Sequence, residues 1–258
     1  MPNAVGALLL FVVLFLAMVG CVELGVRAGR RAFAVDAGRR PAGLGTVETV
    51  AFGLLALLLA FTFSGAADRL DRRRAQIVEE ANDIGTAWLR LDLLPADAQP
   101  KLRDAFRRYT DSRIATYRIF SEDGIAAAKA AYARSVALQN EIWAAAVAAA
   151  RGIPDANIVL LPALNAMFDI TTTRLAATQF HPPLIVYVVL GAISLACAFL
   201  VGYEMGASET RSWPHVLVLA ALLAFTLYVI LDFEYPRLGL IRVDDFDLLL
   251  VQVRASMG

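Results

Sequence analysis

Four long apolar stretches without a charged side chain constrain this chain of 258 residues more than any other feature. They cover residues 4–22, 49–67, 184–203 and 214–231, and the last contains one histidine, His215, near its start. A helix rises about 1.5 Å per residue, so about 20 apolar residues cross the roughly 30 Å hydrocarbon layer of a membrane. Each stretch therefore predicts a membrane-spanning helix, and the four fall into two pairs.

The composition supports a membrane protein and argues against several other classes. Hydrophobic residues make up 59% of the chain, whereas about half the residues of a soluble domain are apolar. The 24 basic and 24 acidic side chains balance, so the net charge indicates no nucleic-acid partner. Cys21 and Cys197 both lie within apolar stretches, and we interpret them as small core side chains rather than as a disulfide or a metal site.

The second apolar stretch continues without a break into a strongly charged segment. Asp68 opens that segment, and no proline occurs between residue 49 and Pro95. Because proline is the residue that most strongly interrupts a helix, its absence favours a single helix. We expect one long helix that leaves the membrane and continues into water.

The polar segment between the two pairs of spans also predicts helices. Nothing in residues 68–181 alternates with the period of two that a strand requires. Asp97 is expected to cap the helix after Pro95, and Ser121 marks a further helix start. Gly152 ends that helix, and Pro154 begins the last one, which the double proline at 182–183 ends.

These patterns predict an all-α integral membrane protein with a helical extramembrane insert between its second and third spans. The expected organisation is spans one and two in residues 1–67, the insert in 68–181, spans three and four in 182–233, and a C-terminal tail in 234–258. With four spans, the insert and both termini share one side of the membrane.

The distribution of arginines near the ends of the spans slightly favours a cytoplasmic location for the insert. Six lie on the side of the short loops: Arg27, Arg30, Arg31, Arg39, Arg40 and Arg211. Eight lie on the side of the insert: Arg69, Arg72, Arg73, Arg74, Arg174, Arg237, Arg242 and Arg254. Since basic residues favour the cytoplasmic side, we expect a multi-pass protein of the inner (cytoplasmic) membrane with its insert and termini in the cytoplasm.

Motifs typical of enzymes do not occur in the sequence. It contains no G-x-S-x-G, Walker A, GxGxxG or HExxH pattern and no cysteine pair at metal-binding spacing. Its two histidines, His181 and His215, both lie at membrane boundaries. We therefore expect a protein that is not an enzyme and that carries no cofactor and no metal.

Polar residues of the insert form the more informative set. They are Glu79, Glu80, Asn82, Arg90, Tyr109, Arg113, Asn165, Asp169 and Arg174. Asp83 and Thr86 lie in the same stretch of the long helix. One interpretation is a buried network that fixes helix packing, since buried charges must be paired, and we favour it. The other is a site for a ligand or an ion.

Four segments resemble a known family. They are EEANDIGTAWLRLDLLP (79–95), YTDSR (109–113), LNAMFD (164–169) and LDFEYPRLGLIRV (231–243). These segments are similar to the bestrophin-like family, membrane proteins of bacteria and plants that are regarded as distant relatives of the bestrophins. The resemblance extends from residue 46 onward, and its motif after the fourth span contributes Asp232, Glu234, Pro236 and Gly239.

The resemblance implies a channel. Bestrophins are pentameric anion channels with two helix pairs around a cytoplasmic helical domain, and the second helix of each subunit lines a central pore. The expected partners are then the lipid bilayer, further copies of the chain in a homo-oligomer (a pentamer by resemblance), and inorganic ions such as chloride. The alternative function is a non-conducting membrane sensor or scaffold whose insert binds a partner or an ion.

Two further expectations concern pore and metal residues. The pore-lining candidates on the second span lie within about 60° of one another on a helical wheel. They are Phe52, Ala56, Leu59 and Phe63, which we name the predicted stripe. Bestrophins hold calcium with an acidic cluster after the last span. Here Asp244, Asp245 and Asp247 lack the spacing of a calcium loop, and we interpret them as a solvated turn.

Overall fold

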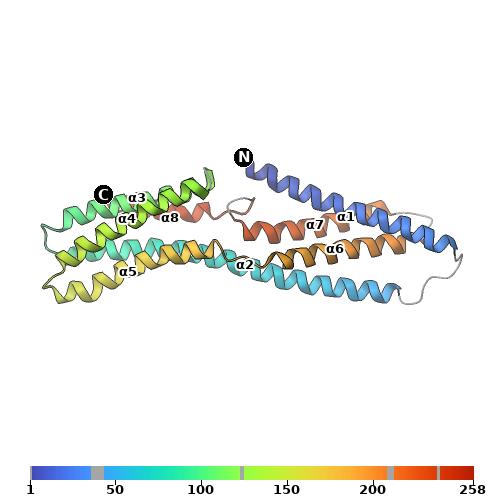
Figure 1. The fold of residues 1–258 in the computed structure, drawn as a ribbon, viewed down its shortest axis with the longest axis horizontal. Coiled ribbons are helices and arrows are strands. Elements are labelled where there is room, and N and C mark those ends of the chain that lie inside the picture. The colour runs from blue at the N-terminus through green and yellow to red at the C-terminus, as the bar shows by residue number, and fades with distance from the viewer. Residues whose placement is uncertain (1, 36–43, 123–124, 208–211, 237–238) are drawn as a thin grey trace. The chain divides into compact units, whose positions relative to one another are not determined.

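The computed structural model describes residues 2–35, 44–122, 125–207, 212–236 and 239–258 (Figure 1). The regular elements of these residues are all helical, which confirms the predicted all-α class. In chain order they are α1 (Pro2–Val35), α2 (Leu44–Arg90), the 3₁₀ turn η1 (Leu91–Leu93), α3 (Gln99–Glu122), α4 (Ile125–Ala149), α5 (Pro154–Ala177), α6 (Leu184–Met205), α7 (Trp213–Glu234) and α8 (Asp244–Ala255). Arg39, Arg40, Arg211 and Arg237 of the orientation count lie outside the described residues.

Four of the helices are long and apolar enough to cross a membrane, as the sequence predicts. They are α1, α2, α6 and α7. The second is a continuous helix of 47 residues, so the apolar stretch and the charged segment after it belong to one element. It ends at Arg90, and η1 completes the segment before Pro95.

Two predicted helix starts differ from the structure. The helix after Pro95 begins at Gln99, two residues beyond Asp97, and Asp97 is exposed. Ser121 lies in the last turn of α3 rather than at a helix start, and α4 begins at Ile125. A serine followed by acidic residues is compatible with either end of a helix, and the glycine at position 124 is the stronger break in the sequence.

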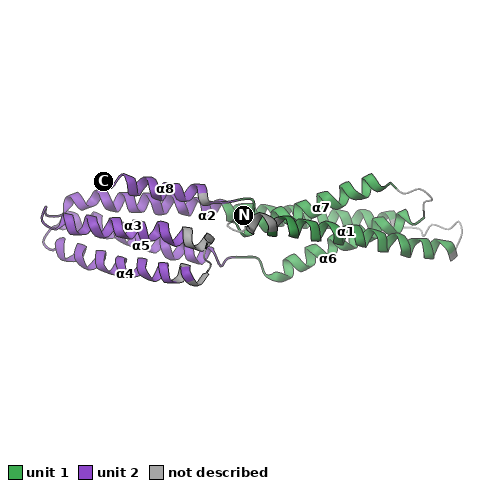
Figure 2. Cartoon of the chain, turned by 90° about the horizontal axis from the view of Figure 1, so that it is seen from above, with its two compact units in different colours: residues 1–70, 181–241 green, residues 71–180, 242–258 purple. Residues whose placement is uncertain are grey.

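The helices form two compact units, drawn in green and purple in Figure 2. Unit 1 contains Met1–Leu70 and His181–Ile241, and unit 2 contains Asp71–Phe180 and Arg242–Gly258. The long helix α2 therefore contributes to both units. The C-terminal helix α8 belongs to unit 2, where it packs on α3.

Unit 1 is built on the packing of α1 against α6 and α7. Its buried apolar side chains are Met18, Val22, Val26, Leu190, Ala198, Val216, Ala220 and Leu227. Leu58 and Leu59 of α2 pack against this cluster. Cys197 is buried and Cys21 is half-buried, and neither forms a disulfide.

Paired glycines bring α1 and α6 into backbone contact. Gly25 and Gly29 form a G-x-x-x-G motif on α1, and Gly202 of α6 forms a second one with Gly206, the residue directly after the end of α6. Small residues at this spacing let two membrane helices approach closely, because no side chain separates their backbones.

The space at these glycines is too small for any side chain. A Cβ atom on Gly202 would lie 2.0 Å from the carbonyl oxygen of Val22. A Cβ atom on Gly25 would lie 2.1 Å from the carbonyl oxygen of Phe199. Both contacts are with backbone of the partner helix, so a substitution must push α1 and α6 apart.

Unit 2 is a helical bundle of the second half of α2 with α3, α4, α5 and α8 (Figures 1 and 2). Its core contains large apolar side chains from each of these helices, among them Trp88, Phe106, Ile142, Leu160 and Leu250. Charged groups also lie inside this bundle, and they form the first part of the candidate site.

Candidate functional site

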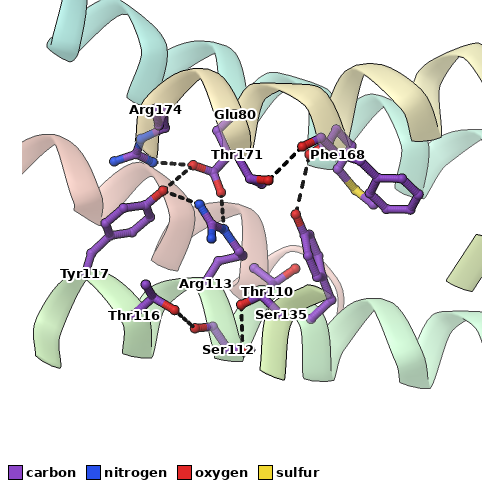
Figure 3. Close-up of polar contacts among 12 residues, drawn as sticks. Glu80, Thr110, Ser112, Arg113, Thr116, Tyr117, Ser135, Phe168, Thr171 and Arg174 are labelled. Atoms are coloured by element: carbon purple, nitrogen blue, oxygen red, sulfur yellow. Dashed lines mark hydrogen bonds and ion pairs between the residues drawn. The ribbon is translucent and has the colours of Figure 1, made fainter. Parts of the chain in front are cut away.

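A cluster of charged side chains is buried in the centre of unit 2 (Figure 3). It consists of Glu80 from α2, Arg113 and Tyr117 from α3, Arg174 from α5 and Asp247 from α8, and we name it the buried ion cluster. The Glu80 carboxylate is fully buried, and the two arginine side chains are 1% and 7% exposed. The cluster therefore joins four helices through charge in addition to their apolar packing.

Glu80 is the common acceptor of the cluster. Nε of Arg113 donates to Oε1 of Glu80 at 2.6 Å, and the Tyr117 hydroxyl donates to Oε2 at 2.9 Å. Arg174 also donates to Oε2, and its other terminal nitrogen lies 3.4 Å from Asp247. The Arg174 guanidinium stacks over the Tyr117 ring, 3.7 Å from its centroid. Both carboxylate oxygens thus accept hydrogen bonds from charged or hydroxyl donors.

The environment keeps Glu80 ionised. Burial alone would raise the pKa of Glu80, but the adjacent charges of Arg113 and Arg174 outweigh it and lower this pKa below its ordinary value. Burial, followed by the charge of Glu80, raises the pKa of Tyr117, so the phenol stays protonated and donates its hydrogen. The cluster is a fixed ion pair at neutral pH and does not exchange a proton there.

Further polar contacts extend from this cluster toward α4. Gln139 on α4 donates to the Tyr109 hydroxyl and to Thr171, each at 3.3 Å. Ser112 and Ser135 share a hydrogen bond of 2.8 Å between α3 and α4. All five side chains are buried. This polar layer crosses the bundle and fixes the register of its helices.

The structure brings together only some of the predicted network residues. Glu80, Arg113 and Arg174 meet directly, and Tyr109 lies in the adjoining polar layer. Arg90 instead donates to the carbonyl of Val159 at 2.6 Å. Four others are exposed on the surfaces of α2 and α5: Glu79, Asn82, Asn165 and Asp169.

Sequence reasoning missed several members of the site. Tyr117 lies four residues after Arg113, so the two share a helix face, and that spacing was a usable signal. No comparable pattern in the sequence points to Gln139 of the Ala-rich helix α4. Asp247 is part of α8 and pairs with Arg174, so its interpretation as part of a solvated turn is wrong.

A second charged cluster lies at the end of α7 in unit 1. Glu234 is 1% exposed, and its carboxylate accepts hydrogen bonds from Arg69 of α2, one of them 2.8 Å long. Nδ1 of His181, just before α6, lies 3.4 Å from the same carboxylate. The His181 ring stacks on Tyr235 with 4.7 Å between centroids. We name these four residues the membrane-end cluster, and they join α2 and the end of α7 to the segment just before α6.

The remaining residues of the motif after the fourth span form a tight turn. The Asp232 carboxylate is 4% exposed and accepts the backbone N–H of Leu240 at 3.1 Å and of Ile241 at 2.9 Å. A Cβ atom on Gly239 would lie 1.1 Å from Oδ1 of Asp232. Pro236 is buried in the same turn. The backbone at Leu240 and Ile241 is therefore held against the carboxylate of Asp232, at the end of α7.

The Gly239→Ala variant is expected to unfold more easily than the native chain. The new methyl group displaces the Asp232 carboxylate from the backbone N–H groups of Leu240 and Ile241, and losing hydrogen bonds to a charged group costs about 2–4 kcal/mol. Thermal unfolding in detergent measures the effect. Because the clash needs the carboxylate, adding Gly239→Ala to an Asp232→Ala variant should cost far less than adding it to the native chain. Equal costs in both backgrounds would contradict this account.

A comparison with known families identifies the chain. A family model described as a Bestrophin-like domain matches residues 12–247. The chain belongs to the bestrophin-like family. The match covers both units and confirms the resemblance inferred from the four segments. No curated protein and no solved structure matches the chain at a significant level. Together with the four candidate spans, family membership makes it a multi-pass membrane protein.

The predicted stripe of this bestrophin-like chain is partly covered by other residues of the same chain. Leu59 packs against the apolar core of unit 1, and the ring centroids of Phe63 and Phe233 lie 5.3 Å apart. Phe52 is half-buried and Ala56 is exposed. Across the described residues, no group of three or more His, Cys, Asp or Glu side chains is placed to hold a metal ion.

Proposed function

We propose that this bestrophin-like chain is one subunit of a homo-oligomeric ion channel whose pore is lined by α2. The observation that carries the proposal is how little of α2 its own subunit covers. Only 11% of the residues in the most apolar 18-residue stretch of α2 are buried, against 22% in the corresponding stretches of α1 and α6 and 44% in that of α7. The uncovered surface must face lipid, other subunits or a pore, and membership of the bestrophin-like family supports the pore.

The face of α2 turned away from its own subunit is the better candidate for the pore wall. Leu55 and Ala66 mark the buried direction of this helix. At 100° per residue, an opposite set of exposed residues lies about 120–180° from them. This set, which we name the exposed stripe, consists of Gly53, Leu57, Phe61 and Ser64. Phe61 is 69% exposed and Leu57 is 53% exposed, so both are free to form an apolar constriction.

The ions conducted are small anions such as chloride. Residues 49–67 of α2 carry neither acidic nor basic side chains, so the proposed pore wall holds no fixed charge that selects between ions, and the assignment of anions rests on kinship with the bestrophins, which are anion channels. Kinship with the bestrophins favours a pentamer. The arginine distribution favours the inner membrane with unit 2 and both termini in the cytoplasm.

Thiol modification of reconstituted channels tests which residues line the pore. In a background with Cys21→Ala and Cys197→Ala, we expect a charged methanethiosulfonate reagent to reduce the current of Leu57→Cys strongly. Leu59→Cys is the matched control, since it changes the same residue type two positions away on the covered side. Current that falls at Leu59→Cys and not at Leu57→Cys would instead favour the predicted stripe. If neither variant responds, α2 does not line the pore.

A further inference from the structure

An open hollow of about 250 Å³ lies between α2 and α5 in unit 2, apart from the buried ion cluster. Three polar side chains line it from α2, namely Asp83, Thr86 and Arg90. They stand three, four and seven residues apart, so they share one face of the helix. The hollow is somewhat smaller than the roughly 300–1,000 Å³ of a pocket for a drug-sized ligand, so its size suits a smaller molecule.

Small residues of α5 create this hollow. Pro162, Ala163 and Ala166 line it opposite the polar face of α2. Pro162 lies inside α5 and has no N–H group to donate, which loosens the backbone hydrogen bonding around it. Arg90 donates one N–H to the carbonyl of Val159 at 2.6 Å. This bond anchors the guanidinium at the edge of the hollow.

The polar groups of the hollow are largely unused by the protein. Arg90 makes one hydrogen bond within the described residues, although a guanidinium has five N–H donors. Six threonines of the described helices donate to a backbone carbonyl four residues earlier: Thr49, Thr62, Thr110, Thr116, Thr173 and Thr226. Thr86 makes no such bond, and no described residue accepts from or donates to Asp83.

The two ends of the hollow favour opposite charges. Burial and then the nearby Glu79 and Glu80 carboxylates raise the pKa of Asp83. A cation beside Asp83 would therefore stabilise the ionised form of this side chain. The planar fork of Arg90 matches a carboxylate, which it can bind through two parallel hydrogen bonds. Thr86 lies between them on the helix face and can donate or accept.

We propose that this hollow binds a small zwitterion of the amino-acid class. Its ammonium group pairs with Asp83, its carboxylate pairs with Arg90, and Thr86 hydrogen-bonds to the molecule between them. The inference does not depend on conduction, because it rests on contacts within unit 2 alone. It also gives the insert of this channel subunit a binding role of its own.

Calorimetric titration of the full-length protein in detergent tests the proposal. The probes are glycine, β-alanine and 5-aminopentanoate, which separate the two charges by increasing lengths, with propionate and propylammonium as singly charged analogues. We expect one zwitterion to bind about tenfold or more tightly than either analogue, since each loses a charge-assisted contact. Asp83→Asn and Arg90→Gln should each weaken that binding by a similar factor.

Matched variants separate binding from folding. Thr86→Val removes no hydrogen bond of the described protein and should still weaken binding severalfold. Asp97→Asn and Arg151→Gln change the same residue types at exposed positions and should leave binding unchanged. The proposal is overturned if no zwitterion binds more tightly than the singly charged analogues. It is also overturned if binding survives in Asp83→Asn, Thr86→Val and Arg90→Gln.

Discussion

The Glu80→Gln variant is expected to lose about 3–5 kcal/mol of stability in unit 2, the cost of leaving a buried charge without its partner. The substitution keeps the size of the side chain and removes its charge. Arg113 and Arg174 then remain buried, and among the described residues the partly exposed Asp247, beside Arg174, is the one acidic partner left in the cluster. Thermal unfolding followed by circular dichroism in detergent measures the loss.

The neighbouring residue provides a matched control for this prediction. Glu79 is exposed on the same helix, so Glu79→Gln makes the same chemical change without exposing a buried charge and should alter stability little. Replacing the three buried groups together, as Glu80→Met, Arg113→Leu and Arg174→Met, should recover much of the stability, because the three most buried charges of the cluster are then absent. Equal effects of Glu79→Gln and Glu80→Gln would contradict the buried ion cluster.

The stability difference between the native chain and the Glu80→Gln variant is expected to depend on pH. The pKa of Glu80 is lower in the folded state than its ordinary value of 4.5, so the unfolded chain binds the proton more readily. Stability from this carboxylate is therefore present above pH 4.5 and is lost as the pH falls through the lower, folded pKa. The difference in melting temperature between the native chain and Glu80→Gln should be steady near neutral pH and should narrow below pH 4.5.

The Gly202→Ala variant is expected to disrupt the packing of α1 on α6 and to yield little folded protein. The added methyl group would lie 2.0 Å from the carbonyl oxygen of Val22, a backbone atom that cannot move without its helix. Overpacking by a single methyl group typically costs about 1–3 kcal/mol, and the backbone contact places this site at the upper end or beyond. Fluorescence-detected size-exclusion chromatography reports the yield of folded protein.

Gly191 on the same helix is the control for this substitution. A Cβ atom there meets nothing within 4 Å, so Gly191→Ala should be neutral or should stabilise the helix by up to about 1 kcal/mol. Of the two alanine variants of α6, only Gly202→Ala is thus expected to destabilise the protein. A well-folded Gly202→Ala protein would show that α1 and α6 do not cross at their glycines.

The elements that the sequence predicted well are those whose signal is contained in a single segment. The four spans follow from length and apolar composition alone, and the continuity of α2 follows from the absence of proline. Gly25, Gly29, Gly202 and Gly206 have the G-x-x-x-G spacing in the sequence, although no prediction was drawn from them. What the sequence did not provide was their pairing, because the contact depends on two helices about 175 residues apart in the chain.

Predicting the candidate site required knowing which of several similar side chains are buried, and a single sequence does not show this. Glu79 and Glu80 are adjacent and chemically alike, but they point about 100° apart on α2, and only Glu80 faces α3 and α5. Which of them is buried is decided by the packing of the whole bundle. The role of Gly239 was likewise hidden, since it depends on the position of the Asp232 carboxylate seven residues earlier.

Electrical recording from the purified protein in planar lipid bilayers tests the central claim most directly. The proposed function predicts unitary currents in asymmetric KCl whose reversal potential lies near the chloride equilibrium potential. It also predicts that a charged thiol reagent reduces the current of Leu57→Cys in the cysteine-free background. The absence of current from protein shown by cross-linking to be oligomeric in the same lipid would contradict it.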